Sequence, residues 1–147
     1  MKQVFVSTWK SSVQPRKQRK YVANAPRHIK SSMVVGHLEK TLRQKYNTRN
    51  VRMRVGDKVK ILRGQFKGVI GKIDSIDVHK QKLFIEKVEQ VKKSGAKVPY
   101  PIHTSNVLVM ELILTDKKRK EKLQHNSQDS KVKESKAAST KKTTEKS

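Results

Sequence analysis

Residues 55–73, VGDKVKILRGQFKGVIGKI, form the stretch of sequence that decides the fold. Val55, Val59 and Ile61 fall on one face of an extended chain, because side chains alternate between the two faces of a strand. The lysines between them fall on the other face. This alternation predicts a half-buried β-strand.

A different pattern follows at residues 63–68, RGQFKG, where two glycines flank a bulky and a cationic side chain. Gly64 and Gly68 allow a positive φ angle or a close backbone approach that a Cβ atom forbids. An apolar run then resumes at Val69. The pattern predicts a β-hairpin with a small cationic tip, in which the backbone of Gly68 matters most to the turn.

The pattern GDxVxxxxGxxKGxxGxI, which runs from Gly56 to Ile73, resembles the KOW motif of several ribosomal proteins and transcription elongation factors. The resemblance implies an SH3-like β-barrel and, in most cases, contact with RNA. It does not by itself distinguish a ribosomal protein from a polymerase factor.

The chain is strongly basic, with 36 Lys and Arg against 12 Asp and Glu and a formal net charge of +24 over 147 residues. Self-repulsion of this size favours a polyanionic partner, and nucleic acid is the first candidate. A membrane surface is the competing polyanion, but no stretch approaches the roughly 18 apolar residues of a spanning helix, and no leader-like apolar segment follows the first residues. The absence of cysteine excludes disulfides and thiolate metal sites.

The positive charge is most one-sided in residues 1–52, which carry 13 Lys and Arg and 1 Glu. Within them, QPRKQRK at residues 14–20 places four cations in five residues with no acid nearby. Such a run repels itself as an isolated helix and suits an extended chain laid along phosphates. A solvated, disordered arm is the alternative, but the total charge favours RNA.

The remaining periodicities predict one short helix and several more strands. Leu38 and Leu42 lie one helical turn apart, which predicts an amphipathic helix over residues 38–46 that ends near Asn47. VLVMELIL at residues 107–114 is apolar at seven of its eight positions and predicts a strand covered on both faces. We expect about five short strands around one small core. The sequence also predicts a strand at 82–87, turns at 24–26, 77–80 and 94–97, and an edge or loop segment at 98–102.

Several segments together resemble one family of ribosomal proteins. They are QPRKQRK at 14–20, NAP at 24–26 with the following His28, LxxxLRQKY at 38–46, PIHTSNV at 101–107 and DKKR at 116–119. Their order is similar to that in the large-subunit ribosomal protein numbered twenty-four, in its archaeal and eukaryotic form, with the archaeal form closer. VGHLE at residues 35–39 departs from the serine- and proline-containing segment that usually introduces the short helix of this family.

The resemblance implies a structural constituent of the large ribosomal subunit that binds the first domain of large-subunit ribosomal RNA early in assembly. It also implies a position at the rim of the polypeptide exit tunnel, neighbouring ribosomal proteins as partners, and a cytoplasmic, ribosome-bound location. Factors that dock at the tunnel exit are further candidate partners.

With 3 Phe, 3 Tyr and 1 Trp, the chain lacks the stacking platform of a domain that reads single-stranded bases. It is expected to recognise folded RNA by shape and phosphate contacts. Among Trp9, Tyr21, Phe66 and Tyr100, only Phe66 at the hairpin tip is expected to stack on a base. The predicted RNA-binding set is Arg16, Lys17, Arg19, Lys20, Arg27, His28, Lys30, Arg52, Arg54, Lys58, Lys60, Arg63, Gly64, Phe66, Lys67, Gly68, Lys72, His103, Ser105 and Asn106.

No catalytic or metal-binding pattern competes with this interpretation. The hairpin glycines miss the GxxxxGK[ST] spacing of a phosphate loop, and Ile73 stands where a hydroxyl would hold magnesium. The histidines lack HExxH or cysteine companions. Asp74 and Asp77 are expected to form turns or pair with lysines rather than act as a catalytic pair. We therefore expect no enzyme activity, no cofactor, no metal and no small-molecule substrate.

Two other functional classes share the charge. A transcription elongation factor uses the same hairpin module on polymerase, but the arm at residues 14–20 and the lack of a second globular domain argue against it. A nucleoid-type DNA binder has no use for the hairpin.

The charge and the periodicity divide the chain into four parts within a mostly β fold with extended basic segments. We expect a basic N-terminal extension with a short helix at 1–50, an SH3-like KOW barrel at 51–115, a C-terminal helix at 116–125 and a disordered tail at 126–147. The tail is rich in Lys, Ser, Thr, Glu and Gln and cannot offset the roughly 1–2 kcal/mol per residue that ordering a backbone costs.

Overall fold

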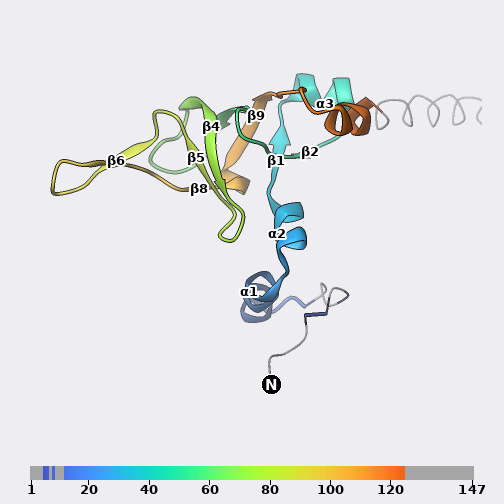
Figure 1. Ribbon diagram of the computed structural model, residues 1–147, viewed down its shortest axis with the longest axis horizontal. Helices are drawn as coiled ribbons and strands as arrows, with labels where there is room; N and C mark the ends of the chain where they lie inside the picture. The colour runs from blue at the N-terminus through green and yellow to red at the C-terminus, as the bar shows by residue number, and fades with distance from the viewer. Residues whose placement is uncertain (1–4, 7, 9–11, 125–147) are drawn as a thin grey trace, which may run out of the picture.

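The computed structural model describes residues 5–6, 8 and 12–124. It confirms a mostly β fold built on a small barrel-like sheet (Figure 1). The strands are β1 (Val35–Leu38), β2 (Asn50–Arg52), β3 (Lys58–Ile61), β4 (Ile70–Asp77), β5 (Lys82–Ile85), β6 (Glu89–Val91), β7 (Lys97–Pro99), β8 (Ile102–His103) and β9 (Val107–Glu111). The helices are α1 (Pro15–Asn24), α2 (Arg27–Met33), α3 (Lys40–Tyr46), the 3₁₀ turn η1 (Thr104–Asn106) and a C-terminal helix at 117–124. The predictions for Trp9 and for the tail at 126–147 lie outside the described residues.

Seven strands form one sheet in the order β2-β1-β9-β3-β4-β5-β8, and β6 pairs with β7 in a separate ribbon. Paired strands are antiparallel except β1 and β9, which run parallel with His37 opposite Leu108. One core of mainly Val, Leu and Ile side chains lies against this sheet. Figure 1 shows the β6 and β7 ribbon projecting from one side, and α2 and then α1 leading away from the sheet in another direction.

The predicted hairpin is confirmed in β3 and β4. Val59 and Ile61 are fully buried, as the alternation in the sequence requires. The turn is closed by two hydrogen bonds: Ile61 N–H donates to Val69 O at 3.0 Å, and Gly68 N–H donates to Ile61 O at 2.8 Å. Gly64 and Gly68 have φ angles of +95° and +91°, which an L side chain adopts only with strain.

The prediction that Val55 shares the buried face of this strand is wrong. Val55 is 57% exposed, because the chain turns at Val55 and Gly56 before the strand begins at Lys58. Gly56 has a φ angle of +90°, and a Cβ atom there would clash with the side chain of Ile113. The positive backbone angle therefore favours glycine at this turn, and a larger residue would also have to displace the end of the Ile113 side chain.

The basic arm is helical rather than extended. α1 begins at Pro15, whose fixed φ angle and missing N–H suit the first position of a helix. Lys, Arg and Gln are good helix formers, and here their propensity outweighs the charge repulsion. The turn predicted at residues 24–26 is confirmed, since α1 ends before Pro26 and α2 begins after it.

The short amphipathic helix is α3, and it begins two residues later than predicted. Leu38 belongs to β1 and is fully buried, because the parallel pairing with β9 continues as far as Leu38 opposite Val109. α3 then starts at Lys40. Its predicted end is confirmed, since Asn47 has a φ angle of +46° and terminates the helix in the left-handed conformation.

The described residues contain nine strands rather than about five, because several strands are only two to four residues long. The predicted strand after the hairpin is β5, preceded by a turn in which Asp77 Oδ1 accepts the N–H groups of His79 and Lys80. The turn at 94–97 joins β6 to β7, with Gly95 at a φ angle of +81°. The proline-containing segment forms β7 and leads into β8, an edge strand of the sheet, as predicted.

β9 and the C-terminal helix complete the core. β9 lies in the interior of the sheet between β1 and β3. Arg119 and Leu123 of the C-terminal helix lie one turn apart and are both buried. The core draws on residues before position 50, such as Val34, and after position 115, such as Leu123, as well as on the segment between them.

Candidate nucleic-acid interface

The tip of the β3–β4 hairpin presents exposed cations on a backbone held by hydrogen bonds. Arg63, Gly64, Lys67 and Gly68 are all exposed. Lys67 N–H donates to Gly64 O at 3.1 Å, so the turn is ordered by its own backbone. Neither cation makes an ion pair among the described residues, and both are available to a polyanion.

Phe66 of the hairpin tip is already packed. Its ring lies 5.3 Å from the ring of Tyr100, tilted by 50°, and both side chains are partly buried against the core. Aromatic pairs at such distances are stabilising beyond their buried area. The segment that leads into β8 therefore packs against the hairpin tip and helps to hold it in place.

The segment at residues 103–106 lies beside the hairpin. Leu62 N–H donates to Asn106 O at 2.8 Å, which joins the base of the turn to η1. His103 Nδ1 accepts the N–H of Ser105 at 3.2 Å and lies 2.9 Å from Ser105 Oγ. The structure thus brings His103, Ser105 and Asn106 next to the tip, although about forty positions separate them in the sequence.

His103 contributes hydrogen bonding rather than charge. Partial burial lowers the pKa of its imidazole below the ordinary 6.5, and the positive charge of Lys82 lowers that pKa further. The ring is therefore mostly neutral at pH 7. Because Nδ1 accepts from the Ser105 backbone, the proton of the neutral ring is on Nε2, which can donate to a phosphate or a ribose oxygen.

The lysines along β3 and β4 differ in whether an acidic side chain lies close enough to offset their positive charge. Lys58 Nζ lies 2.7 Å from Glu111 Oε1, so its charge is partly offset. Lys58 is opposite Lys72 in the sheet, and Lys60 is opposite Ile70. Lys60 and Lys72 have no acidic partner among the described residues.

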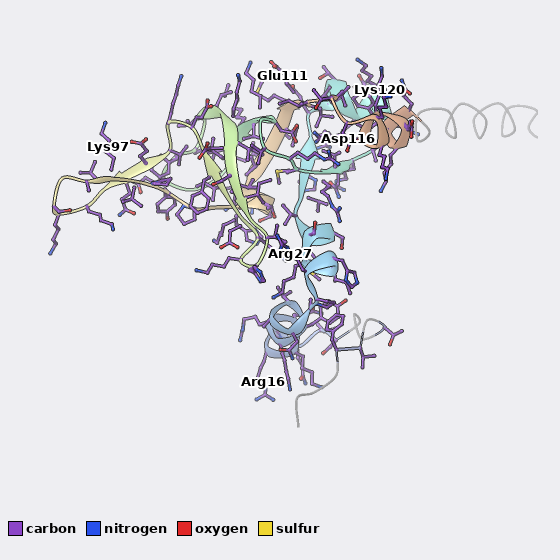
Figure 2. All side chains as sticks on the ribbon, in the orientation of Figure 1. Arg16, Arg27, Lys97, Glu111, Asp116 and Lys120 are labelled. Atoms are coloured by element: carbon purple, nitrogen blue, oxygen red, sulfur yellow. The ribbon has the colours of Figure 1, made fainter. Side chains whose placement is uncertain are left out.

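The predicted cations of α1 are all exposed, and Figure 2 shows Arg16 at the far end of this helix from the sheet. α1 has no acidic residue. Its one buried side chain is Tyr21, whose ring lies 4.9 Å from that of Phe5. The helix therefore presents charge over most of its surface; the cations are Arg16, Lys17, Arg19 and Lys20.

In α2 the predicted residues divide between solvent and protein. Arg27 and His28 are exposed. Lys30 is only 9% exposed, and its Nζ donates to Ala23 O at 2.9 Å. The ammonium group of Lys30 therefore ties α2 to the end of α1, a local role that the sequence did not indicate.

Arg52 and Arg54 lie at the other side of the sheet, next to the C-terminal helix. The Arg54 guanidinium lies 2.5 Å from Asp116 Oδ2 and lowers the pKa of that carboxyl, mainly through this hydrogen bond. Asp116 Oδ1 also accepts the N–H of Lys118 at 3.0 Å and so caps the helix. Arg52 is exposed and makes no ion pair among the described residues.

A buried ion pair joins the KOW segment to the C-terminal helix, and the sequence reasoning missed it. Asp57 is fully buried, and its two carboxylate oxygens lie 2.8 and 2.7 Å from Nη1 and Nη2 of Arg119. The same carboxylate accepts N–H groups from Arg54 and Ile113. Asp57 belongs to the KOW pattern and Arg119 to the DKKR segment, so both residues lie in segments that resemble the family. They are 62 positions apart, however, and nothing in the sequence indicates that they pair.

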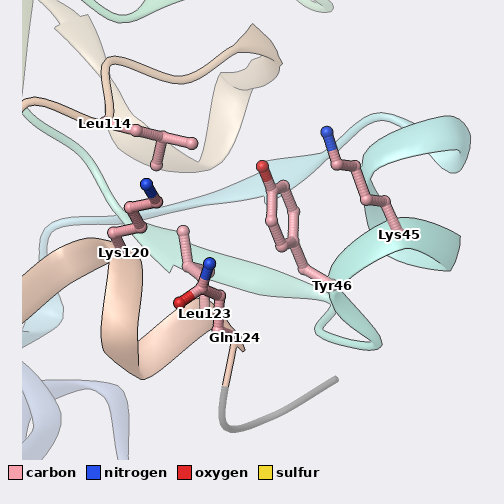
Figure 3. Close-up of a pocket in the computed structure, with 6 residues that line it drawn as sticks. All are labelled: Lys45, Tyr46, Leu114, Lys120, Leu123 and Gln124. Atoms are coloured by element: carbon pink, nitrogen blue, oxygen red, sulfur yellow. The ribbon is translucent and has the colours of Figure 1, made fainter. Parts of the chain in front are cut away.

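Two hollows flank the C-terminal helix. The smaller, of about 270 Å³, has an apolar floor of Tyr46, Leu114 and Leu123, with Lys45 and Lys120 beside it (Figure 3). The larger, of about 410 Å³, lies between the helix, β2 and the end of α2.

The described part of the chain contains no group of three or more His, Cys, Asp or Glu residues arranged to hold a metal ion. Within that same part, no helix is long and apolar enough to cross a membrane.

Comparison with known families identifies the chain. The family that comprises the L26 ribosomal proteins of eukaryotes and their L24-type archaeal counterparts matches residues 12–126. The match runs from just before α1 to just beyond the C-terminal helix, and so includes the hairpin, the segment at 103–106 and the buried ion pair. The chain belongs to this family of eukaryotic and archaeal ribosomal proteins, which are structural constituents of the large ribosomal subunit.

Proposed function

We propose that this protein binds large-subunit ribosomal RNA through phosphate and shape contacts and holds that RNA in the folded subunit. The observation that carries the proposal is the joint surface of the hairpin tip and residues 103–106. This surface combines exposed cations, a neutral imidazole donor and polar side chains on a braced backbone. Phosphate contacts of this kind fix register and orientation on a nucleic acid.

The predicted residues take different roles in this proposal. Arg63 and Lys67 at the tip, with Lys60 and Lys72 behind them, contact phosphates of a folded helix or loop. Ser105 and Asn106 supply neutral hydrogen-bonding groups that can also contact a 2′-hydroxyl. The exposed cations of α1, with Arg27 and His28, form a second contact away from the sheet.

We further propose, from the family resemblance, that binding occurs early in assembly and on the first domain of the large rRNA. The same resemblance supports a position near the rim of the polypeptide exit tunnel, where neighbouring ribosomal proteins and exit-site factors are candidate partners. The protein then acts in the cytoplasm without enzymatic activity or a cofactor. The family match supports the ribosomal assignment and gives no support to the elongation-factor alternative.

The first experiment measures the affinity of the full chain for a transcript of the first domain of large-subunit rRNA as a function of KCl concentration. If about six to ten phosphates are neutralised, log K falls by roughly 0.7 to 0.9 per contact for each tenfold rise in salt. Cosedimentation of the protein with large subunits after a salt wash gives an independent readout. A salt slope near zero, or cosedimentation with polymerase instead, contradicts the proposal.

The second experiment asks whether RNA approaches the hairpin backbone closely. An alanine Cβ at Gly68 would meet no atom within 4 Å, so Gly68→Ala costs only the strain of its positive φ angle, about 1 kcal/mol. Gly95→Ala is the matched control, with the same sign of φ and equally open surroundings at a turn outside the proposed contacts. If RNA backbone lies against Gly68, Gly68→Ala lowers affinity more than Gly95→Ala at equal loss of stability. Equal affinities would show that RNA does not approach Gly68.

A further inference from the structure

The larger hollow beside the C-terminal helix is built from three segments that are far apart in the sequence. Its walls come from the end of α2, from β2 with the residues just before it, and from the helix at 117–124. It has a volume of about 410 Å³. We call it the β2 groove; the lining residues that matter here are Ser32, Thr48, Asn50, Arg52, Lys118 and Lys122.

Helix periodicity explains why the groove is cationic. Arg119 and Leu123 face the core, so residues one position before each of them, Lys118 and Lys122, fall together on the flank over β2. Lys120 and Gln124 fall on the opposite flank and line the other hollow, as Figure 3 shows. The groove therefore receives two lysines from one helix face.

The charge in the groove is not neutralised by the protein. Lys118 and Lys122 are exposed and have no acidic partner among the described residues, and the same holds for Arg52 across the groove. Arg54 also lines the groove, but Asp116 already pairs with it. The two carboxylates that contact groove residues, those of Asp116 and Asp57, are already paired with Arg54 and Arg119.

Groups that can donate or accept hydrogen bonds line the rest of the groove. Asn50 Oδ1 lies 2.5 Å from His37 Nδ1, which assigns the amide oxygen as the acceptor of that bond and leaves the amide NH₂ as a donor. The hydroxyls of Ser32 and Thr48 each donate to a backbone carbonyl, so their oxygens remain acceptors. Arg119 forms part of the wall at 7% exposure, and its Nε is a buried donor with no acceptor among the described residues.

We propose that the β2 groove is a second RNA site, which binds the sugar–phosphate backbone of ribosomal RNA. Arg52, Lys118 and Lys122 contact phosphate oxygens, and Asn50 donates to a phosphate or a ribose oxygen. The acceptor oxygens of Ser32 and Thr48 suit a 2′-hydroxyl, which RNA has and DNA lacks. This inference rests on the proposed rRNA-binding function and adds a surface away from the hairpin.

The first test compares two double variants of the full chain. Lys118→Ala with Lys122→Ala removes two charges from the groove, whereas Lys117→Ala with Lys120→Ala removes two charges from other faces of the same helix. Loss of two phosphate contacts lowers the salt slope by roughly 1.4 to 1.8 and the affinity at 0.2 M salt by roughly tenfold. The control pair loses only screened long-range attraction, roughly threefold or less.

Both double variants raise helix propensity equally, so circular dichroism is expected to show the same helix content in each. Equal losses of affinity in the two double variants overturn the inference, because the groove then acts only through bulk charge. If the wild-type protein itself shows no salt-dependent binding to the transcript, the proposed function fails, which is a distinguishable result.

The second test uses the absence of cysteine from the chain. Ser32→Cys places a thiol in the groove, and Glu121→Cys places one on an exposed position of the C-terminal helix that lines neither hollow. The rRNA transcript alone is expected to slow alkylation of the first thiol by at least tenfold and to leave the second unchanged. Protection in whole subunits but neither by this transcript nor by full-length large-subunit rRNA would identify a protein neighbour as the occupant and would overturn the assignment to RNA.

Discussion

Two basic helices, one near each end of the described chain, show what decides whether a cationic segment joins a fold. α1 carries four cations and one buried side chain, and that side chain packs on Phe5 rather than on the core. The C-terminal helix at 117–124 carries five cations, yet two of its residues are buried and one of these, Leu123, belongs to the core. Charge alone therefore does not separate the two helices.

The two helices differ in whether side chains one turn apart form a face that packs against the rest of the protein. The C-terminal helix places Arg119 and Leu123 on one face, and the buried carboxylate of Asp57 receives the guanidinium. It is also capped by Asp116. α1 has Gln14 at its N-cap, without a side-chain cap hydrogen bond, and lacks a comparable inward face. One helix is thus part of the structure, while the other is held mainly by its connection through α2.

The largest expected effect comes from breaking the ion pair that docks the C-terminal helix. Asp57→Ala leaves the buried guanidinium of Arg119 without its carboxylate and removes the acceptor of the N–H groups of Arg54 and Ile113. We expect a loss of about 3–5 kcal/mol in the free energy of unfolding, measured by urea denaturation of the full chain.

The surface pair of Lys58 and Glu111 provides the control for this measurement. Its atoms lie 2.7 Å apart, but the two side chains are 41% and 67% exposed, so Glu111→Ala should cost about 0–1 kcal/mol. The double change Asp57→Leu with Arg119→Met should recover part of the lost stability, because no charge then remains buried, while the N–H groups of Arg54 and Ile113 still lack their acceptor. Equal costs for Asp57→Ala and Glu111→Ala would show that the C-terminal helix is not held by this pair.

The next effect concerns the apolar contact of each helix. Leu123 is 4% exposed and lies in the core, so Leu123→Ala should cost about 2–3 kcal/mol through lost burial and the cavity that remains. Tyr21→Ala removes a larger side chain from α1 but should leave the unfolding midpoint of the sheet unchanged, since Tyr21 is not in the core. A comparable shift in both variants would mean that α1 is docked as firmly as the C-terminal helix.

The sequence showed the sheet more clearly than it showed the helices. The hairpin was predictable because the alternation at Val59 and Ile61 and the glycines at 64 and 68 are local signals. The helical state of residues 15–24 was not, since repulsion and helix propensity oppose each other and the sequence gives no measure of which is larger.

The candidate site was likewise only partly predictable, because local signals do not show which distant residues come together. The cations of the hairpin tip could be named from the motif, but the position of residues 103–106 beside the base of the turn depends on the pairing of strands far apart in the sequence. Lys30 was named as an RNA contact from its charge, and its hydrogen bond to Ala23 O depends on the angle between α1 and α2. Lys118 and Lys122 were not named, because only the buried positions of Arg119 and Leu123 show which helix face they occupy.

A smaller effect, dependent on pH, should come from the cap of the C-terminal helix. The pKa of Asp116 is lowered from 3.8 in the folded protein, chiefly by the hydrogen bond from Arg54. The unfolded chain therefore binds the proton more readily, so the stabilisation by this carboxylate is complete above the unfolded pKa and is lost as the pH falls through the folded pKa.

Asp116→Asn keeps a capping side chain but removes the charge. The difference in unfolding free energy between wild type and this variant should be constant near neutral pH, shrink as the pH falls below about 4, and be smaller throughout than the Leu123→Ala effect. A pH-independent difference would show that the ion pair with Arg54 contributes nothing.

The smallest effect on stability is expected from removing the cations of α1, a change that should instead weaken RNA binding. Replacing Arg16, Lys17, Arg19 and Lys20 by Ala removes exposed charges from a helix that does not enter the core, and Ala is the best helix former. The unfolding midpoint should not change, whereas the salt slope for the rRNA transcript should fall by roughly 3 if each cation neutralises one phosphate.

The control for this quadruple variant removes the same charge from Lys80, Lys92, Lys93 and Lys97, exposed residues outside the proposed contacts. Because these lysines act only through screened long-range attraction, the control should keep a salt slope within about one unit of wild type. If the α1 variant instead binds the transcript as tightly as wild type, α1 is a solvated helix, and the contrast between the two helices concerns stability alone. If it binds weakly and also unfolds early, α1 contributes to the fold in a way that its lack of core contacts does not explain.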